Sequence, residues 1–237
     1  MGRIEYLEVG GRSVAYRLRT GNVPTIVFLP GYGSDMEGTK ALKLDEFAAR
    51  RGVAALRLDY SGTGSSAGRF EEGTLAHWIE EALAAIDKLT EGPLILVGSS
   101  MGGWIALHLA LMRPERVRAL VGIAAAPDFT EWGFSAEQKA ALQSDGKLGD
   151  QLSLAFWESG QQLCLLEREI AIDAPVRLLH GELDRDVPLD IAFRLLRRLR
   201  SSDVQLNVLK GGGHRLSEPR EILAILSTVE ALLEPPA

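Results

Sequence analysis

The five residues from Gly98 to Gly102 read Gly-Ser-Ser-Met-Gly and have the form G-x-S-x-G. An apolar run at 93–97 precedes them, and a helix-forming run at 104–112 follows. A strand, a sharp turn and a helix in this order lift the serine hydroxyl above the edge of a sheet, where a base can reach it. We therefore expect Ser100 to be a nucleophile. The two glycines are expected because the neighbouring chain passes too close for side chains.

A serine hydroxyl is a weak nucleophile, so it needs an adjacent base that is itself held by a third group. Three histidines follow Ser100 in the chain, namely His108, His180 and His214. His108 falls inside the helix after the turn, and His180 ends a strand that we expect to be buried. His214 closes a Gly-Gly-Gly-His run between the last expected strand and the last helix, so we assign it as the base.

The third group should be a carboxylate on the loop after the preceding strand, because acid and then histidine follow the serine along the chain. That loop, residues 181–188, offers Glu182, Asp184 and Asp186. The residues alone leave these three in competition. An aspartate here can also cap the helix that opens near Pro188, which is what we expect of Asp186.

Acyl transfer also needs two backbone N–H donors for the oxyanion of the tetrahedral intermediate. Met101 directly follows the serine at a helix N-terminus, whose dipole favours negative charge. Tyr32 follows Pro30-Gly31 in the loop after the third expected strand. We expect the N–H groups of Tyr32 and Met101 to be this pair of donors, each worth about 3 kcal/mol of transition-state stabilisation.

Strand and helix patterns alternate along most of the chain, and this alternation positions the loops described above. The expected strands are 5–9 and 13–18, which form a hairpin, and then 25–29, 53–58, 93–97, 117–124, 176–179 and 204–209. The expected helices are 39–50, 74–89, 104–112, 189–200 and a last one that Ser217 caps and that ends near 233. Strands that alternate with helices predict an α/β fold, with a mostly parallel sheet and helices on both faces.

The alternation breaks from about Pro127 to Ile172, where aromatic residues occur without a clear strand and helix pattern. We interpret this stretch, residues 127–172, as a small inserted cap, and residues 1–126 and 173–237 as the core. The aromatic residues fit an acyl pocket as well as they fit the interior of the cap.

The chain has 237 residues, of which 46% are hydrophobic and 24% charged, as expected for a single globular domain with a sizeable core. Its formal net charge of −6 argues against a nucleic-acid surface. Cys164 is the only cysteine, no apolar run is long enough for a membrane span, and the first residues lack the apolar core of a secretory signal. We expect a cytoplasmic monomer or weak homodimer.

We expect no cofactor and no metal. The stretch from Gly62 to Ala67 matches a dinucleotide-binding pattern, but no helix opens there and the unit is not the first strand–helix–strand unit. No group of histidine, cysteine and aspartate has the spacing of metal ligands in the sequence.

Several short segments carry a more specific likeness, namely 28–32, 34–36, 38–42, 59–62, 98–104, 177–181 and 214–215. In these segments the chain resembles the α/β-hydrolase superfamily and, within it, the animal mitochondrial enzymes described as palmitoyl-protein thioesterases and acyl-glucuronide esterases. The resemblance implies an α/β-hydrolase fold and a triad of Ser100, Asp184 and His214, which places Asp184 above Asp186. The expected cap is least similar, so substrate preference transfers least.

These expectations describe a serine hydrolase that cleaves carboxylic esters or thioesters through an acyl-enzyme. Its partner would be a small acyl ester or thioester, or an acylated protein. We rank medium- to long-chain acyl thioesters first and small aryl or acyl-glucuronide esters second. Two alternatives remain: a C–C bond hydrolase or perhydrolase with the same triad, and a non-catalytic binding protein of the same fold.

Overall fold

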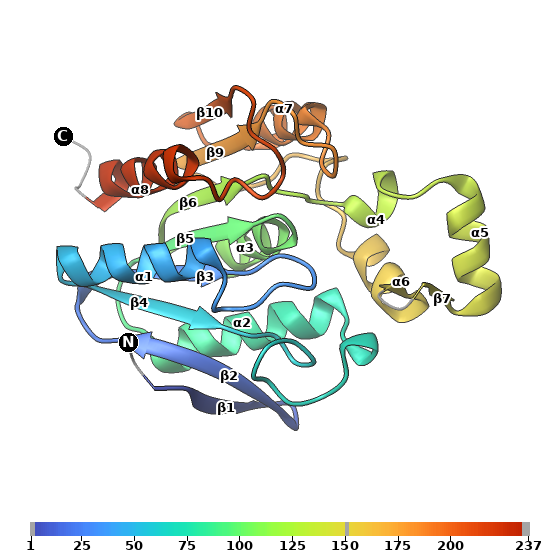
Figure 1. Ribbon diagram of the computed structural model, residues 1–237, viewed down its shortest axis with the longest axis horizontal. Coiled ribbons are helices and arrows are strands. Elements are labelled where there is room, and N and C mark those ends of the chain that lie inside the picture. The colour runs from blue at the N-terminus through green and yellow to red at the C-terminus, as the bar shows by residue number, and fades with distance from the viewer. Residues whose placement is uncertain (1–2, 150–151, 234–237) are drawn as a thin grey trace.

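The computed structural model describes residues 3–149 and 152–233. Both ends of the expected core and positions 150–151 of the expected cap lie outside the described residues. An eight-stranded sheet forms the centre, in the order β1-β2-β4-β3-β5-β6-β9-β10 (Figure 1). Its strands are β1 (Glu5–Val9), β2 (Arg12–Arg19), β3 (Asn22–Leu29), β4 (Val53–Leu58), β5 (Leu94–Ser99), β6 (Val117–Ile123), β9 (Val176–Gly181) and β10 (Val204–Leu209).

The sheet is mostly parallel, as the sequence predicts. Strands β1 and β2 form the expected antiparallel hairpin, and β2 also pairs antiparallel with β4. The strands from β4 to β10 along the sheet pair in parallel. The carboxyl ends of the parallel strands therefore meet at one edge, where the loops after them can bring distant residues together.

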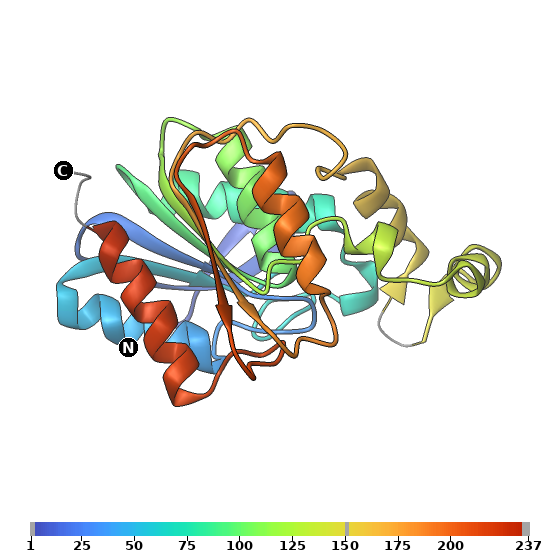
Figure 2. The ribbon, with the colours of Figure 1, turned by 90° about the horizontal axis from the view of Figure 1, so that it is seen from above.

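Helices cover both faces of the sheet (Figures 1 and 2). Helices α1 (Thr39–Arg51) and α8 (Pro219–Leu233) pack on one face. Helices α2 (Leu75–Leu89), α3 (Met101–Met112) and α7 (Leu189–Arg198) pack on the other, together with the 3₁₀ turn η1 (Phe70–Glu72). Helix α3 is buried on nearly every side, which explains why its sequence is apolar all round. None of the described helices is long and apolar enough to cross a membrane.

The chain between β6 and β9 forms a separate group of short elements beyond the carboxyl ends of the parallel strands (Figures 1 and 2). These elements are α4 (Phe129–Trp132), α5 (Ala136–Asp145), α6 (Leu154–Gln162) and a two-stranded ribbon of β7 (Lys147–Leu148) and β8 (Leu152–Ser153). Sequence periodicity missed α4 and the ribbon because they are short. It missed α5, which is as long as α7, because only Leu142 of that helix is buried, so the helix has no apolar face. Their boundary signals are nevertheless present: Ser135 and Gln138 form a capping box at the start of α5, and Gly146 ends it in a left-handed conformation.

Several expected boundaries differ from the structure by one to three residues. The largest differences are at the start of β3, which begins at Asn22 rather than at 25, and at the start of α3, which begins at Met101 rather than at 104. Strand β9 continues to Gly181, and α7 ends at Arg198, two residues early. After that point the backbone pairs with Ile170 instead, which donates to the Arg198 carbonyl at 2.7 Å. Helix α8 begins at Pro219, so the residue before it is Glu218 rather than the expected cap Ser217, and the Glu218 N–H donates to the Glu221 carboxylate at 2.9 Å.

Candidate active site

The turn between β5 and α3 holds Ser100 in a strained conformation, with φ 54° and ψ −121°. A non-glycine residue adopts such a positive φ only when the surrounding structure enforces it. Two hydrogen bonds do so here. The Ser100 N–H donates to the Ile123 carbonyl at 2.9 Å, and the Ser100 carbonyl accepts from Gly103 at 2.9 Å. The turn therefore presents the hydroxyl at the carboxyl edge of the sheet.

Both glycines of the motif are required by the backbone around them. A Cβ atom at Gly98 would overlap the Gly102 carbonyl, and a Cβ atom at Gly102 would overlap the carbonyl of Leu29 on β3. The close approach expected from the sequence is therefore present. It allows the helix after the serine to start directly against the neighbouring strand.

Three loops bring Ser100, His214 and Asp184 into contact. His214 Nε2 lies 3.1 Å from Ser100 Oγ, and His214 Nδ1 lies 2.9 Å from Asp184 Oδ2. The Asp184 side chain is fully buried, whereas the His214 side chain is 21% exposed. This chain of contacts can move a proton from the hydroxyl to the imidazole and hold the resulting imidazolium beside a carboxylate.

Asp184 is held as a carboxylate by its neighbours. Its Oδ1 accepts hydrogen bonds from the N–H groups of Asp186 and Val187, both at 2.9 Å. Burial raises the pKa of Asp184, but the hydrogen bonds from His214 and from these two N–H groups outweigh it and lower the pKa overall. Asp184 therefore faces the histidine in its charged form at neutral pH.

Asp186 does not cap α7, contrary to the sequence-based expectation. The residue before that helix is Pro188, and no side chain accepts a hydrogen bond from its first turn. The Asp186 side chain instead borders a cavity that also contains Ser100 and His214.

The acid loop and the histidine loop are bound to each other. Glu182 accepts from the Gly211 N–H at 2.9 Å, and the Leu183 N–H donates to the Gly212 carbonyl at 2.8 Å. Glu182 was one of three candidate acids in the sequence, and its contact shows a positioning role instead. His180, buried as expected, supports the same loop: its Nε2 donates to the Val187 carbonyl at 2.9 Å. Sequence reasoning missed the Glu182–Gly211 and His180–Val187 contacts, because no local sequence signal marks either pair.

Met101 and Tyr32 occupy the positions expected for oxyanion donors. Met101 is the first residue of α3, where the N–H has no acceptor within the helix. Tyr32 follows Gly31, at which a Cβ atom would lie 3.8 Å from Ser100 Oγ. The Tyr32 ring is fixed in an aromatic cluster with Phe70, Trp78, Phe129 and Phe156. The role of the two N–H groups stays a prediction.

A cavity of about 160 Å³ lies above Ser100 and His214. Tyr32 and Val187 from the core and Phe129 and Trp132 from the chain after β6 supply most of its apolar wall. Phe156, another aromatic residue of the expected cap, is only 1% exposed and packs against Tyr32 and Trp78 of the core. The Trp157 Nε1–H donates to the Thr130 carbonyl at 2.9 Å, within the expected cap. The aromatic residues of this stretch therefore divide between the wall of the cavity and packed positions.

Donor atoms of Asp184, Asp186 and His214 lie within 4.8 Å of one another, a grouping that the sequence spacing did not reveal. Both oxygens of Asp184 already accept hydrogen bonds, and both His214 nitrogens contact Asp184 or Ser100. A metal at this point would replace those bonds, so we assign none to it.

The α/β-hydrolase fold family matches residues 24–149, more than half of the chain. The chain belongs to the α/β-hydrolase family. It is a hydrolase, which the names of the similar palmitoyl-protein thioesterases support. The match includes the strand and turn that carry Ser100, whereas His214 and Asp184 lie beyond it.

Individual α/β hydrolases match over nearly the full length. The human mitochondrial palmitoyl-protein thioesterase ABHD10 is 39% identical over 94% of this chain and 77% of its own. The solved structure of mouse α/β hydrolase domain-containing protein 10 has a TM-score of 0.92 at 36% identity, covering 98% of each chain. A putative hydrolase from Agrobacterium vitis has a TM-score of 0.91 at 38% identity, covering 98% of this chain and 99% of its own.

These relatives correct the expected cellular location. The sequence favoured a cytoplasmic protein, but the ABHD10 proteins from human, orangutan and cattle are named as mitochondrial. The names of these relatives therefore contradict the cytoplasmic expectation. A lone cysteine does not distinguish these two compartments, since neither requires disulfides.

Proposed function

We propose that this hydrolase cleaves acyl thioesters and carboxylic esters through an acyl-enzyme on Ser100. The observation that carries the proposal is His214, which contacts Ser100 Oγ at 3.1 Å and Asp184 Oδ2 at 2.9 Å beside an apolar cavity. A nucleophile, a base and an acid in this geometry are the requirements for acyl transfer. The names of the palmitoyl-protein thioesterase relatives support an acyl substrate.

The first half of the reaction forms the acyl-enzyme. Ser100 Oγ attacks the acyl carbonyl carbon while His214 Nε2 accepts the hydroxyl proton. The N–H groups of Tyr32 and Met101 hold the oxyanion. Asp184 keeps the Nδ1–H tautomer of His214 and stabilises the imidazolium. His214 then returns the proton to the departing sulfur or oxygen as the carbonyl carbon–leaving atom bond breaks.

The second half releases the acid. Water replaces the leaving group, His214 Nε2 takes one of its protons, and the oxygen attacks the acyl carbon of the ester on Ser100. The same two N–H donors hold the second oxyanion. Collapse of this intermediate breaks the bond to Ser100 Oγ, which regains its proton from His214.

The cavity changes the order of substrates expected from the sequence. A cavity of about 150 Å³ holds one benzene molecule, so the volume of about 160 Å³ above Ser100 holds a short acyl chain or one aromatic ring. We propose short acyl and aryl groups as the substrates of the conformation described here. A palmitoyl-length chain must extend out of this cavity or displace α4.

We also propose that residues 127–172 form a cap over the active site. Phe129 and Trp132, which belong to this stretch, supply one wall of the cavity. Displacement of that wall would lengthen the space available to an acyl chain. The cap would then set chain length, while the core sets the chemistry.

Substitution of the nucleophile tests the proposal. We expect Ser100→Ala to lower kcat on p-nitrophenyl butyrate and on a butyryl thioester by at least about 10⁴-fold, and to abolish labelling by a fluorophosphonate probe. Ser201→Ala is the matched control, because that hydroxyl accepts the Asp203 N–H at the amino end of β10, away from the site. Unchanged hydrolysis by Ser100→Ala would rule the mechanism out. A wild-type protein that neither turns over nor reacts with the probe would instead be a binding protein.

A further inference from the structure

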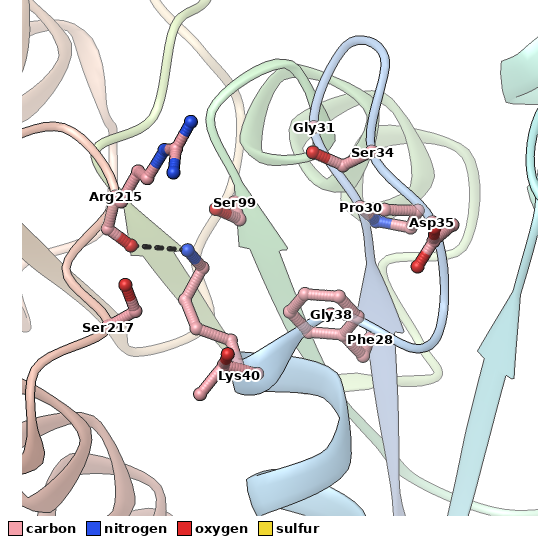
Figure 3. A pocket seen from close by; sticks show the side chains of 11 residues that line it. Phe28, Pro30, Gly31, Ser34, Asp35, Gly38, Lys40, Ser99, Arg215 and Ser217 are labelled. Carbon is pink, nitrogen blue, oxygen red and sulfur yellow. Dashed lines mark hydrogen bonds between the residues drawn. The ribbon is translucent and has the colours of Figure 1, made fainter.

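A polar pocket of about 300 Å³ lies between the loop after β3 and the loop before α8 (Figure 3). Lys40 enters it from the first turn of α1, and Arg215 borders it from the loop before α8. Hydroxyl groups line much of the remaining wall, from Ser34, Thr39, Ser99 and Ser217. This lining contrasts with the apolar cavity above Ser100.

The pocket carries two cationic groups with donors to spare. Lys40 Nζ donates one hydrogen bond to the Arg215 carbonyl, and an ammonium has three N–H donors. Among the residues that the structure describes, no side chain accepts a hydrogen bond from the Arg215 guanidinium. Burial lowers the pKa of Lys40, and the adjacent Arg215 lowers it further while Glu221 raises it. An anion beside Nζ would offset both effects that disfavour the charged form.

The acidic groups near this pocket already accept hydrogen bonds from backbone N–H groups. Asp35 is the one carboxylate in the described lining, and its Oδ1 accepts the Glu37 N–H at 2.9 Å. Glu221 accepts the Glu218 N–H at 2.9 Å. Helix α1 has no acidic residue in its first turn. These hydrogen bonds leave the carboxylates charged, but the lining still holds two cations, Lys40 and Arg215, against the one carboxylate of Asp35, in a chain whose formal net charge is −6.

The lining of the pocket includes the residues next to Ser100 and His214 in the sequence. Ser99 precedes Ser100, Arg215 follows His214, and a Cβ atom at Gly31, which lines the pocket, would lie 3.2 Å from Ser100 Cβ. A thioester or ester carbonyl has two substituents, the acyl group and the leaving group. The apolar cavity suits the acyl group. The polar pocket suits the leaving group.

We propose that this pocket is a leaving-group subsite that selects thiols or alcohols carrying a carboxylate or phosphate a few bonds from the scissile atom. The inference rests on the acyl transfer proposed at Ser100. Lys40 and Arg215 bind the anionic oxygens while Ser100 Oγ bonds to the acyl carbon. The carbon–sulfur or carbon–oxygen bond then breaks, and the leaving atom takes the proton from His214 into the pocket.

The test compares leaving groups that differ only in charge. The substrates are the S-butyryl esters of 3-mercaptopropionate and of 3-mercaptopropionamide, and a second pair is S-butyryl phosphopantetheine and S-butyryl pantetheine. We expect wild-type kcat/KM to be about tenfold higher for the anionic member of at least one pair, the size of a charged hydrogen bond in a solvent-accessible pocket. The pair with the larger ratio identifies carboxylate or phosphate as the preferred anion.

Variants then assign the ratio to the pocket. Lys40→Met and Arg215→Gln should each bring the ratio toward one, by raising KM for the anionic substrate while hydrolysis of the neutral one is retained. Lys43→Met is the matched control, because Lys43 pairs with Glu46 on the exposed side of α1. Its ratio should equal that of the wild type.

The outcomes separate this inference from the proposed function. If the wild-type enzyme hydrolyses both members of each pair equally, the subsite is wrong and the acyl transfer stands, whatever the variants do. If the enzyme hydrolyses none of the four thioesters and Ser100 does not react with a fluorophosphonate, the proposed function itself fails. An equal loss on charged and neutral substrates in Lys40→Met and Arg215→Gln would also overturn the inference.

Discussion

Asp184 makes contacts in two directions, and this distinguishes it from its neighbour Asp186. One carboxylate oxygen contacts His214 Nδ1, and the other accepts two backbone N–H groups of its own loop. The Asp184 side chain therefore orients His214 and also stabilises the turn to which Asp184 itself belongs. Asp186 has a position beside the cavity and no such bond among the described residues.

Replacement of the acid tests this difference at the residue scale. In Asp184→Asn, an amide can present its N–H to His214 Nδ1 and favour the wrong tautomer, so we expect kcat to fall by about 10⁴-fold. We expect Asp186→Asn to retain most of its activity because His214 keeps its partner. Steady-state hydrolysis of p-nitrophenyl butyrate measures both, with circular dichroism as the folding check. A greater loss in Asp186→Asn would transfer the acid role to Asp186.

Acid should weaken the folded protein through the same carboxylate. The pKa of Asp184 is lower in the folded protein than its ordinary value of about 3.9. Its stabilising contribution is therefore complete above that value and is lost as pH falls toward and through the folded pKa. We expect the Tm of wild type to exceed that of Asp184→Asn at pH 6 and the gap to narrow below about pH 4. A gap that is constant from pH 6 to pH 3 would contradict this linkage.

At the scale of elements, Asp128 ties together the two ends of the chain between β6 and β9. It is buried, has φ 57°, and its carboxylate accepts the N–H groups of Leu165 at 2.9 Å and Leu166 at 2.7 Å. Residues 165–166 follow α6, and Asp128 immediately precedes α4. One side chain thus fixes the base of the proposed cap, and with it the wall made by Phe129.

Removal of this carboxylate should loosen the proposed cap. Asp128→Gly suits the left-handed backbone and leaves the Leu165 and Leu166 N–H groups without their acceptor, at a cost of about 1–3 kcal/mol in unfolding free energy for each buried group. We expect faster limited proteolysis between residues 129 and 162. Asp145→Gly, at the exposed end of α5, is the control for the loss of a side chain. Equal protease resistance in the two variants would show that the carboxylate does not anchor this region.

At the scale of the whole molecule, the sheet edge separates two environments around one hydroxyl. An apolar cavity of about 160 Å³ is bordered by the chain after β6, and a polar pocket of about 300 Å³ is bordered by the loops after β3 and β10. Each environment uses elements from distant parts of the chain. The proposed sites for the acyl group and for the leaving group can therefore vary independently of the chemistry proposed at Ser100.

The smaller cavity predicts a limit on acyl chain length. We expect kcat/KM for a series of acyl thioesters to be highest for short chains and to fall as the chain outgrows a volume that fits about one benzene ring. Matched oxyesters of the same chain lengths should show the same limit, because the acyl group is shared. Measurement of both series on one preparation checks this expectation. A maximum at palmitoyl would contradict this limit and would mean that the chain extends out of the cavity or displaces α4.

The sequence by itself determined the fold class and the candidate residues. Long strands and helices have a repeating apolar pattern, so nearly all elements outside residues 127–172 were predicted with small boundary errors. The motif around Ser100 and the order of acid and histidine loops predicted the residues that the structure brings together. These features are local or ordered along the chain, and local patterns can be read without coordinates.

Only the tertiary structure decided what surrounds those residues. The choice between Glu182, Asp184 and Asp186 depended on which carboxylate meets His214, and all three stand on one short loop with similar sequence signals. The polar pocket unites Lys40 and Arg215, which lie 175 positions apart in the chain. Contacts of this kind form because the loops after parallel strands all lie at one edge of the sheet. The periodicity of the sequence does not predict the distances between those loops.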